Sequence, residues 1–406
     1  MWELIQANRR KSIILFLAMG LILILLGFFL GETFLGQGGG PFGIFIAVII
    51  WSILSLVSYF AGSSIILSLS NAKEVTKDVH PQLFNIVEEM SIAANLPKIP
   101  KIYIVNEQAP NAFATGRKPE DSVVAVTAGL LSQLNRDELQ GVIAHEISHI
   151  INRDILFMTF AGIMLGAIVI ISEVFLRGYW IGGGSLNRYK NKSSGGGNEQ
   201  IIIMVFAMIL AISAPILAQL LYFAISRKRE YLADASGVRL TRYPEGLASA
   251  LEKLSQNRFN LNSANKATAG MYIVNPIKKT GMQISDLSST HPPISERIKI
   301  LRGMMHGVDF ADYQTVYNKI KNNSEKLIPD SGLKNKIDIP IVTQIKDAAK
   351  LTKKEEQRKL GDIVMNVNGY NFFNCKCGVT IKVPPTFKSK SVKCPRCGEI
   401  NINSAN

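Results

Sequence analysis

The sequence predicts an α-helical integral membrane protein with four transmembrane helices, a mainly α globular domain carrying a small β-sheet, and a β-rich C-terminal module. Three observations lead to this fold class. Four long apolar stretches carry no charged residue, and about 20 such residues let a helix cross the hydrocarbon core of a bilayer. The segment after the second stretch has the composition of a globular domain. All four cysteines lie in the last 32 residues.

Composition narrows the class of protein further. Hydrophobic residues make up 47% of the chain and charged residues 19%, which excludes an intrinsically disordered protein and disfavours an ordinary soluble enzyme. Four cysteines are too few for a secreted disulfide scaffold of this length. The formal charge is +14, and residues 331–406 contribute 14 Lys and Arg against 6 Asp and Glu, or +8 of it. The C-terminal part is therefore strongly basic.

The four predicted spans lie near residues 13–30, 44–66, 155–175 and 201–226. The first is interpreted as a retained anchor, because its apolar stretch is longer than that of a signal peptide and no A-x-A cleavage site follows it. Arg9, Arg10 and Lys11 precede this span, which predicts a cytoplasmic N-terminus. Four crossings then place residues 71–154, and everything after Arg229, in the cytoplasm as well. A cell membrane of a prokaryote is favoured, since no eukaryotic targeting signal is present.

The third loop fits this orientation poorly. With a cytoplasmic N-terminus, the loop after the third crossing, residues 177–200, should lie outside. It nevertheless carries an excess of positive charge: Arg177, Arg188, Lys190 and Lys192 against Glu199. Positive charges favour the cytoplasmic side, but this rule is a bias and not a strict requirement. The external position of this loop therefore stays open.

The pattern of hydrophobic residues predicts the remaining organisation. Residues 1–72 form a transmembrane hairpin, 73–326 a globular domain interrupted by the third and fourth spans, 327–361 a linker, and 362–406 a cysteine-containing module. Within the globular domain we expect helices over 81–94, 135–151 and 230–262, the last broken at Tyr243–Pro244. Strands are expected over 99–105, 111–115 and 122–126.

The segment His145-Glu146-Ile147-Ser148-His149 carries the clearest chemical signal. Two histidines four residues apart share one face of a helix and can bind the same metal ion. Glu146 lies beside them, where it can accept a proton from a water that the metal activates. The alternative is a pair of surface histidines next to a salt-bridging glutamate.

A catalytic zinc generally needs a third protein ligand. Glu230 and Asp234 are again four residues apart, just beyond the fourth span. One carboxylate could bind zinc while the other accepts the second ring N–H of a ligand histidine; an acidic pair among neighbouring arginines is the alternative. If the helices of His149 and Glu230 both continue into the bilayer, the ligands lie at similar heights, about 9 and 6 Å from the spans.

These motifs, HEISH, a pair of spans and then REYLADA, resemble the HtpX family of membrane-bound zinc metalloproteases, relatives of the CAAX prenyl proteases. The resemblance covers about residues 1–305 and implies a zincin-type (gluzincin) metalloprotease domain facing the cytoplasm. It implies a catalytic zinc on His145, His149 and Glu230, with Glu146 as the general base. Both termini and the active site would lie on the cytoplasmic side.

The resemblance also implies roles for two further motifs. The segment Pro110-Asn111-Ala112-Phe113-Ala114 is similar to the family's edge strand, so Asn111, Ala112, Phe113 and Ala114 would bind an extended substrate. The segment His291-Pro292-Pro293 and Arg297 are similar to a late motif of the family. By this resemblance His291 would donate to the developing oxyanion, and Arg297 would support Asp234. By its sequence alone, His291 is a loop histidine.

The cysteines predict a zinc ribbon with a second, structural zinc ion. The ligands would be Cys375, Cys377, Cys394 and Cys397. Four thiolates close a tetrahedral site and leave no position for catalysis. The first pair is C-x-C, one residue shorter than the common spacing, and disulfides are the alternative. Basic residues around these cysteines could contact anionic lipid or a protein, whereas a nucleic-acid partner is not expected.

The sequence therefore predicts a zinc endopeptidase embedded in the lipid bilayer. By the resemblance, its substrates would be misfolded or damaged membrane proteins or unfolded polypeptides, in membrane-protein quality control. A processing protease with one defined substrate is the nearest alternative. A catalytically silent adaptor that acts through its zinc ribbon is a third, although the presence of Glu146 argues against it.

Overall fold

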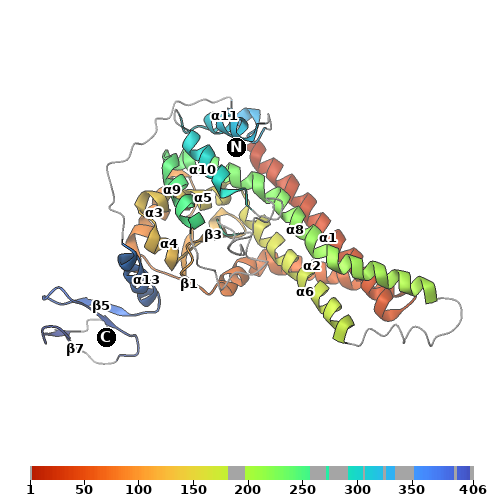
Figure 1. Cartoon of the computed structure of the whole chain (residues 1–406), viewed down its shortest axis with the longest axis horizontal. Helices are drawn as coiled ribbons and strands as arrows, with labels where there is room; N and C mark the ends of the chain where they lie inside the picture. Colours follow the sequence, from red (N-terminus) through yellow and green to blue (C-terminus); the bar gives the residue numbers. More distant parts are fainter. Residues whose placement is uncertain are drawn as a thin grey trace.

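The computed structural model describes residues 2–181, 197–256, 271–273, 291–304, 307–322, 326–333, 352–387 and 391–402. Its long apolar helices are α1 (Trp2–Leu35), α2 (Gly39–Leu69), α6 (Ile155–Ile181) and α8 (Gly197–Thr241). In the described chain these four helices are long and apolar enough to cross a membrane, which confirms the predicted number of spans. They extend together from the globular part of the molecule (Figure 1). Arg188, Lys190 and Lys192 of the third loop lie outside the described residues.

Helices α1 and α2 form a hairpin with direct backbone contact. A Cβ atom added to Gly43 would lie 2.0 Å from the carbonyl oxygen of Gly27, so any larger residue would push the two helices apart. Small residues are the usual means by which membrane helices approach closely. On the outer faces large apolar side chains such as Phe60 stay exposed, as expected where lipid is the solvent.

A four-stranded sheet follows the hairpin. Its strands are β1 (Ala72–Glu74), β2 (Lys101–Val105), β3 (Ala112–Thr115) and β4 (Val123–Thr127), in the order β1-β2-β4-β3. β2 runs parallel to β4, whereas β1 and β3 pair antiparallel at the two edges. The three predicted strands are present with ends shifted by one or two residues. The strand expected from residue 99 begins only after Pro100, since proline has no N–H for the ladder.

Helices cover the sheet and form the core of the globular domain with it. They are α3 (Pro81–Ala93), α4 (Ala128–Gln133), α5 (Arg136–Ile151), α9 (Pro244–Gln256), α10 (Ile294–Gly303) and α11 (Phe310–Lys321), with the short η1 (Pro119–Asp121) and α12 (Asp330–Leu333). α5 begins at a capping box in which Asn135 and Glu138 each satisfy the other's backbone N–H. This cap fixes the start of the helix that carries the HEISH segment.

The third and fourth spans connect to the globular domain in different ways. α8 continues without interruption from the fourth span to Thr241, past Glu230 and Asp234, and the predicted break before Pro244 is present. α5 and α6 are separate helices, because Arg153 between them takes a positive φ of 60°. The helix of His149 therefore does not continue into the third span, so the condition for the estimated height of His149 is not met.

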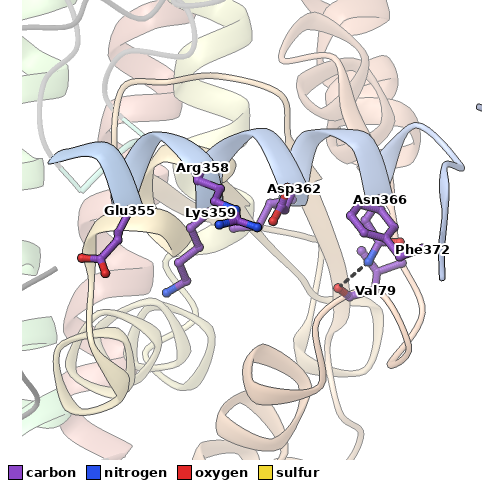
Figure 2. A pocket seen from close by; sticks show the side chains of 8 residues that line it. Val79, Glu355, Arg358, Lys359, Asp362, Asn366 and Phe372 are labelled. Carbon is purple, nitrogen blue, oxygen red and sulfur yellow. Dashed lines mark hydrogen bonds between the residues drawn. The ribbon is translucent and has the colours of Figure 1, made fainter. Parts of the chain in front are cut away.

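The predicted linker over 327–361 also needs correction at its end. Helix α13 (Lys353–Val367) spans the expected boundary at residue 361 and buries Ile363 in the core of the globular domain. The amide of Asn366 donates to the carbonyl of Val79 at 3.2 Å, as Figure 2 shows. A cavity of about 410 Å³ lies beside this contact. The apolar face of α13 thus belongs to the globular domain and not to a free tether.

The C-terminal module consists of two antiparallel hairpins. The first joins β5 (Asn371–Asn374) to β6 (Thr380–Val383), and the second joins β7 (Ser391–Lys393) to β8 (Ile400–Ile402). The module lies at the end of the molecule away from the four apolar helices (Figure 1). Its small core is made by cysteines together with Ile381 and Val383.

Candidate active site

Helices α5 and α8 bring three side chains to one point. The Nε2 atoms of His145 and His149 lie 3.3 Å apart. One oxygen of Glu230 lies 3.5 Å from the Nε2 of His145, and the other lies 3.4 Å from the Nε2 of His149. All three side chains are buried. Residues that are distant in sequence thus form a compact group of nitrogen and oxygen donors.

The donor atoms fit a zinc ion. Zinc bonds to nitrogen and oxygen of about 2.0–2.1 Å in a tetrahedron require ligand atoms roughly 3.3–3.4 Å apart, close to the observed separations. The Oε2 atom of Glu230 is buried and forms no hydrogen bond among the described residues, although Nη1 of Arg297 lies 3.4 Å from it. A buried carboxylate oxygen is costly without full hydrogen bonding, so a metal ion at this point would stabilise Glu230 further.

The remaining ring nitrogen of His145 faces a carboxylate. The Nδ1 of His145 lies 2.9 Å from an oxygen of Asp234. Arg297 donates two hydrogen bonds of 2.8 and 2.6 Å to the same carboxylate. These contacts direct the Nε2 lone pair of His145 toward the centre. Both Asp234 and Arg297 were predicted around the site, and the structure places them there.

His149 has a matching partner that the sequence did not predict. Its Nδ1 atom lies 3.3 Å from an oxygen of Asp154, which is fully buried. Residues five positions apart do not share a face on a continuous helix. The i and i+4 spacing that identifies the other pairs therefore does not identify Asp154. The short turn between α5 and α6 makes this contact.

The carboxylates around the centre favour a positive charge there. Burial alone would lower the pKa of His149, but its hydrogen bonds with Asp154 and Glu230 and their negative charges raise it to about 10. Without a cation at the centre, the carboxylates therefore favour a protonated ring. A bound metal ion supplies that charge in place of the proton.

Glu146 lies on α5 next to the centre. Its side chain is 1% exposed, and it forms no hydrogen bond or ion pair in the described part of the chain. Burial raises its pKa above the ordinary carboxyl value. An unpaired carboxylate with a raised pKa is suited to accept and return a proton.

His291 reaches the same centre from the segment before α10. Its Nε2 lies 3.7 Å from Glu230, and burial lowers its pKa to about 4. The imidazole is therefore neutral at pH 7 and carries one N–H. This geometry accommodates the donor role expected for His291.

The expected substrate strand lies at the sheet edge beside α5. β3 begins at Ala112, one residue after the predicted Asn111, and packs against α5. The register with β4 leaves the backbone groups of Ala112 and Ala114 on the outer edge. However, the carbonyl of Ala112 already accepts a hydrogen bond of 3.0 Å from the N–H of Ile273. Part of this edge is therefore occupied by the chain itself.

The four cysteines form a second group of metal ligands. Their sulfur atoms lie within 4.8 Å of one another, with 3.4 Å between Cys375 and Cys397 and 3.6 Å between Cys377 and Cys394. A tetrahedral zinc with bonds of about 2.3 Å needs sulfur atoms roughly 3.8 Å apart. All four are free thiols, which favours metal binding over the disulfide alternative.

The short C-x-C spacing is accommodated by a tighter turn. The N–H of Gly378 donates to the carbonyl of Cys375, three residues earlier, whereas Gly398 donates to Cys394, four residues earlier. Both glycines have positive φ, 81° and 77°, a conformation in which a side chain is unfavourable. The first knuckle is therefore one residue shorter than the second.

Comparison with known proteins agrees with this geometry. The model of peptidase family M48 matches residues 77–305. A protease HtpX homolog of Dictyoglomus thermophilum is 46% identical over 303 residues, covering 75% of this chain and 94% of the relative. The protease HtpX homolog of Streptococcus uberis is 42% identical over 304 residues, covering 75% of this chain and 100% of the relative.

A solved structure shows a more distant likeness. The crystal structure of S. mikatae Ste24p aligns with a TM-score of 0.40 and 19% identity, over 74% of this chain and 67% of that one. The chain belongs to peptidase family M48, and within it to the membrane-bound HtpX metalloproteases.

Proposed function

We propose that the chain is a zinc endopeptidase that hydrolyses misfolded or damaged membrane proteins at the cytoplasmic face of the membrane. One observation carries the proposal. The nitrogens of His145 and His149 and the oxygens of Glu230 converge at separations of 3.3 to 3.5 Å, beside the buried carboxylate of Glu146. Peptide hydrolysis on a metal needs such an arrangement of ligands and a base.

Each side chain of the centre has a distinct task. His145, His149 and Glu230 would hold the zinc, which supplies a Lewis acid for the peptide carbonyl. Glu146 would take a proton from the attacking water and give it to the leaving amine. His291, neutral at pH 7, would donate a hydrogen bond to the carbonyl oxygen as it gains negative charge.

The connection to the membrane supports substrates that are themselves membrane proteins. Glu230 lies on α8, the helix that also forms the fourth span, so the centre is close to the bilayer surface. Arg9, Arg10 and Lys11 stand at the start of the first span, and positive residues favour the cytoplasmic side. A cytoplasmic centre beside the bilayer would meet the exposed segments of damaged membrane proteins.

Pairing with an edge strand would give broad substrate selection. An extended peptide beside β3 could form backbone hydrogen bonds with Ala114, the outer-edge residue not bonded by Ile273. Such bonds do not depend on side-chain identity. Broad selection suits the removal of misfolded proteins better than the processing of one defined substrate.

We propose a structural zinc on the four cysteines and a polypeptide partner for the ribbon. Of its basic residues, Lys393 and Arg396 are exposed, whereas Lys382 pairs with Asp362 and residues 388 and 390 lie outside the described chain. The separation of the ribbon from the apolar helices (Figure 1) favours a protein over anionic lipid of the same membrane.

The test is hydrolysis of casein by the zinc-loaded, detergent-purified protein. Glu146→Gln should lower the rate about 10²–10⁴-fold while the zinc content stays unchanged. Glu88→Gln, a change at a half-exposed carboxylate, serves as the matched control and should cut normally. A chelator should stop the reaction.

The other outcomes separate the alternatives. Zinc retention without cleavage by the unmutated protein would favour one defined substrate or a silent adaptor. Equal cleavage by the protein and by Glu146→Gln would contradict the role of Glu146.

A further inference from the structure

The turn between α5 and α6 returns the chain to the ring of His149. α5 ends at Ile151, and Arg153 takes a φ of 60°. The N–H of Asp154 then donates to the carbonyl of His149 at 2.9 Å, and its carboxylate lies 3.3 Å from the Nδ1 of the same residue. On a continuous helix, five residues correspond to a rotation of about 140° away from the ring. The break in the helix is therefore what places Asp154 there.

Two other elements hold the carboxylate of Asp154. Asn8 of α1 donates from Nδ2 to its Oδ1 atom at 3.2 Å. The Nη1 of Arg229, on α8, lies 3.4 Å from the same oxygen. One oxygen of Asp154 thus faces the histidine while the other faces the first and fourth apolar helices.

Arg229 is itself fixed by α1. Its Nη2 donates to the carbonyl of Asn8 at 3.1 Å and to the hydroxyl of Ser12 at 2.8 Å. The guanidinium lies 3.7 Å from the ring centroid of Phe157, and the side chain is 2% exposed. A buried guanidinium and a buried carboxylate are stable only when paired, so Arg229 and Asp154 hold each other in place.

The two histidines therefore have parallel supports. His145 faces Asp234, which Arg297 pairs, and His149 faces Asp154, which Arg229 pairs. The difference is that the second support depends on the N-terminal helix. In Figure 1 the beginning of α1 lies at the end of the apolar helices that is nearer the globular domain, and α1 packs against α8.

We propose that Asp154 is a positioning residue for His149, and that Asn8 of α1 and Arg229 of α8 orient its carboxylate. The first apolar helix then contributes to metal binding in addition to anchoring the chain. This inference rests on the proposed zinc site. A partner on the second ring nitrogen fixes the orientation and tautomer of a ligand histidine and increases its basicity.

Zinc affinity tests the proposal in the full chain in detergent, by competition with a chromophoric chelator. Glu230→Ala lacks a ligand of the catalytic site, so the zinc that it still binds is assigned to the cysteines. This amount is subtracted from the zinc bound by each other protein. Asp154→Ala should weaken binding at the remaining site about 10–100-fold. Asp154→Asn should lose less, because its amide oxygen can still accept from the Nδ1–H of His149. Asn8→Ala should weaken binding in the same direction.

Matched controls and a second measurement separate positioning from folding. Gln6→Ala removes an exposed amide from the same helix, and Asp330→Asn changes an exposed carboxylate; neither should alter zinc affinity. The thermal midpoint is compared with and without zinc. A positioning role decreases the gain that zinc confers, whereas a purely structural role lowers both midpoints equally.

Each result bears on the proposal. If Asp154→Ala does not fold, Asp154→Asn and Asn8→Ala decide it. Zinc affinities and zinc-dependent midpoint gains of these two variants equal to those of the controls would overturn it. If the unmutated protein binds no zinc at His145, His149 and Glu230, the proposed function itself is overturned. Normal zinc affinity in the variants would overturn only the positioning role of Asp154.

Discussion

The backbone amide of Ile273 donates a hydrogen bond of 3.0 Å to the carbonyl of Ala112, at the outer edge of the sheet. Tyr272 packs edge to face on Phe113 with 5.2 Å between ring centroids. The carbonyl of Ile273 accepts from Nη1 of Arg297 at 3.3 Å. The chain thus places its own residues at the edge where we propose that an extended substrate pairs, beside the proposed metal ligands. Binding of a substrate strand at Ala112 requires residues 271–273 to move.

Loosening this contact should raise activity. Tyr272→Ala removes an aromatic pair that contributes about 0.5–1.5 kcal/mol, so we expect kcat/KM for casein to increase roughly 2–10-fold, mainly through a lower KM. Tyr272→Phe keeps the ring and loses the hydroxyl contact with Ser70, and should stay near the unmutated value. Unchanged or reduced kcat/KM in a folded Tyr272→Ala would show that these residues do not restrict the edge.

Removal of Arg297 should destabilise the protein strongly. Arg297 is fully buried and forms ion pairs with Asp234 and Glu230, so Arg297→Leu leaves two buried carboxylates without the arginine that neutralises them. The free energy of unfolding should fall by about 3–5 kcal/mol. Arg302→Leu removes an exposed arginine that also pairs with two carboxylates, and should cost less than about 1 kcal/mol. Equal losses in thermal or denaturant unfolding would contradict this difference.

Stability should depend on the protonation of His80. Its Nδ1 accepts the N–H of Leu83 at the start of α3 at 3.1 Å. Burial, together with the charge of Lys359 on α13, lowers its pKa below the ordinary 6.5. Below pH 6.5 the folded state then binds fewer protons than the unfolded state. The stabilisation by the neutral His80 cap is therefore fully present above pH 6.5, and it is lost as the pH falls from 6.5 toward the pKa of the folded state.

The variant His80→Asn isolates this effect. Asparagine caps a helix without titrating, so thermal unfolding from about pH 8 to pH 5 should differ between the two proteins. The unmutated protein should lose up to about 1 kcal/mol more than the variant. Parallel pH profiles would show that the cap is not the titrating element.

The two proposed zinc sites should empty independently. Cys394→Ser should remove one zinc ion per chain and disorder the two hairpins, because the metal replaces most of a core at this size. Casein cleavage should persist, since α13 still packs on the globular domain. His149→Ala should remove the other zinc ion and abolish cleavage. Loss of both ions in either variant, measured by metal analysis, would contradict two separate sites.

Local periodicity predicted the catalytic helix well. The i and i+4 spacing of His145 and His149 places both rings at one point, and the same spacing relates Glu230 to Asp234 on α8. These residues lie on uninterrupted helices, where spacing alone decides which side chains share a face. The apolar spans were equally predictable, because a charge-free apolar run of about 20 residues is typical of a helix that crosses a bilayer.

Contacts that depend on chain reversals were not predictable in the same way. Asp154 reaches His149 only because Arg153 turns the chain, and Ile273 reaches Ala112 across 161 positions, a pairing that no local pattern specifies. In contrast, the helix at the end of the predicted linker could have been predicted from the sequence. Leu360, Ile363, Val364 and Val367 follow the i, i+3, i+4, i+7 pattern of an amphipathic helix, and α13 presents them to the globular domain.

The docking of α13 has a consequence for the minimal length of this protein. The Streptococcus uberis relative matches over its whole length to 75% of this chain, and the match to the family model ends at residue 305. Here, however, Ile363 belongs to the core, and Asn366 bonds a residue 287 positions earlier. Shortening this chain to the length of that relative would expose apolar surface to water. We expect the shortened protein to aggregate, although every residue of its catalytic centre would still be present.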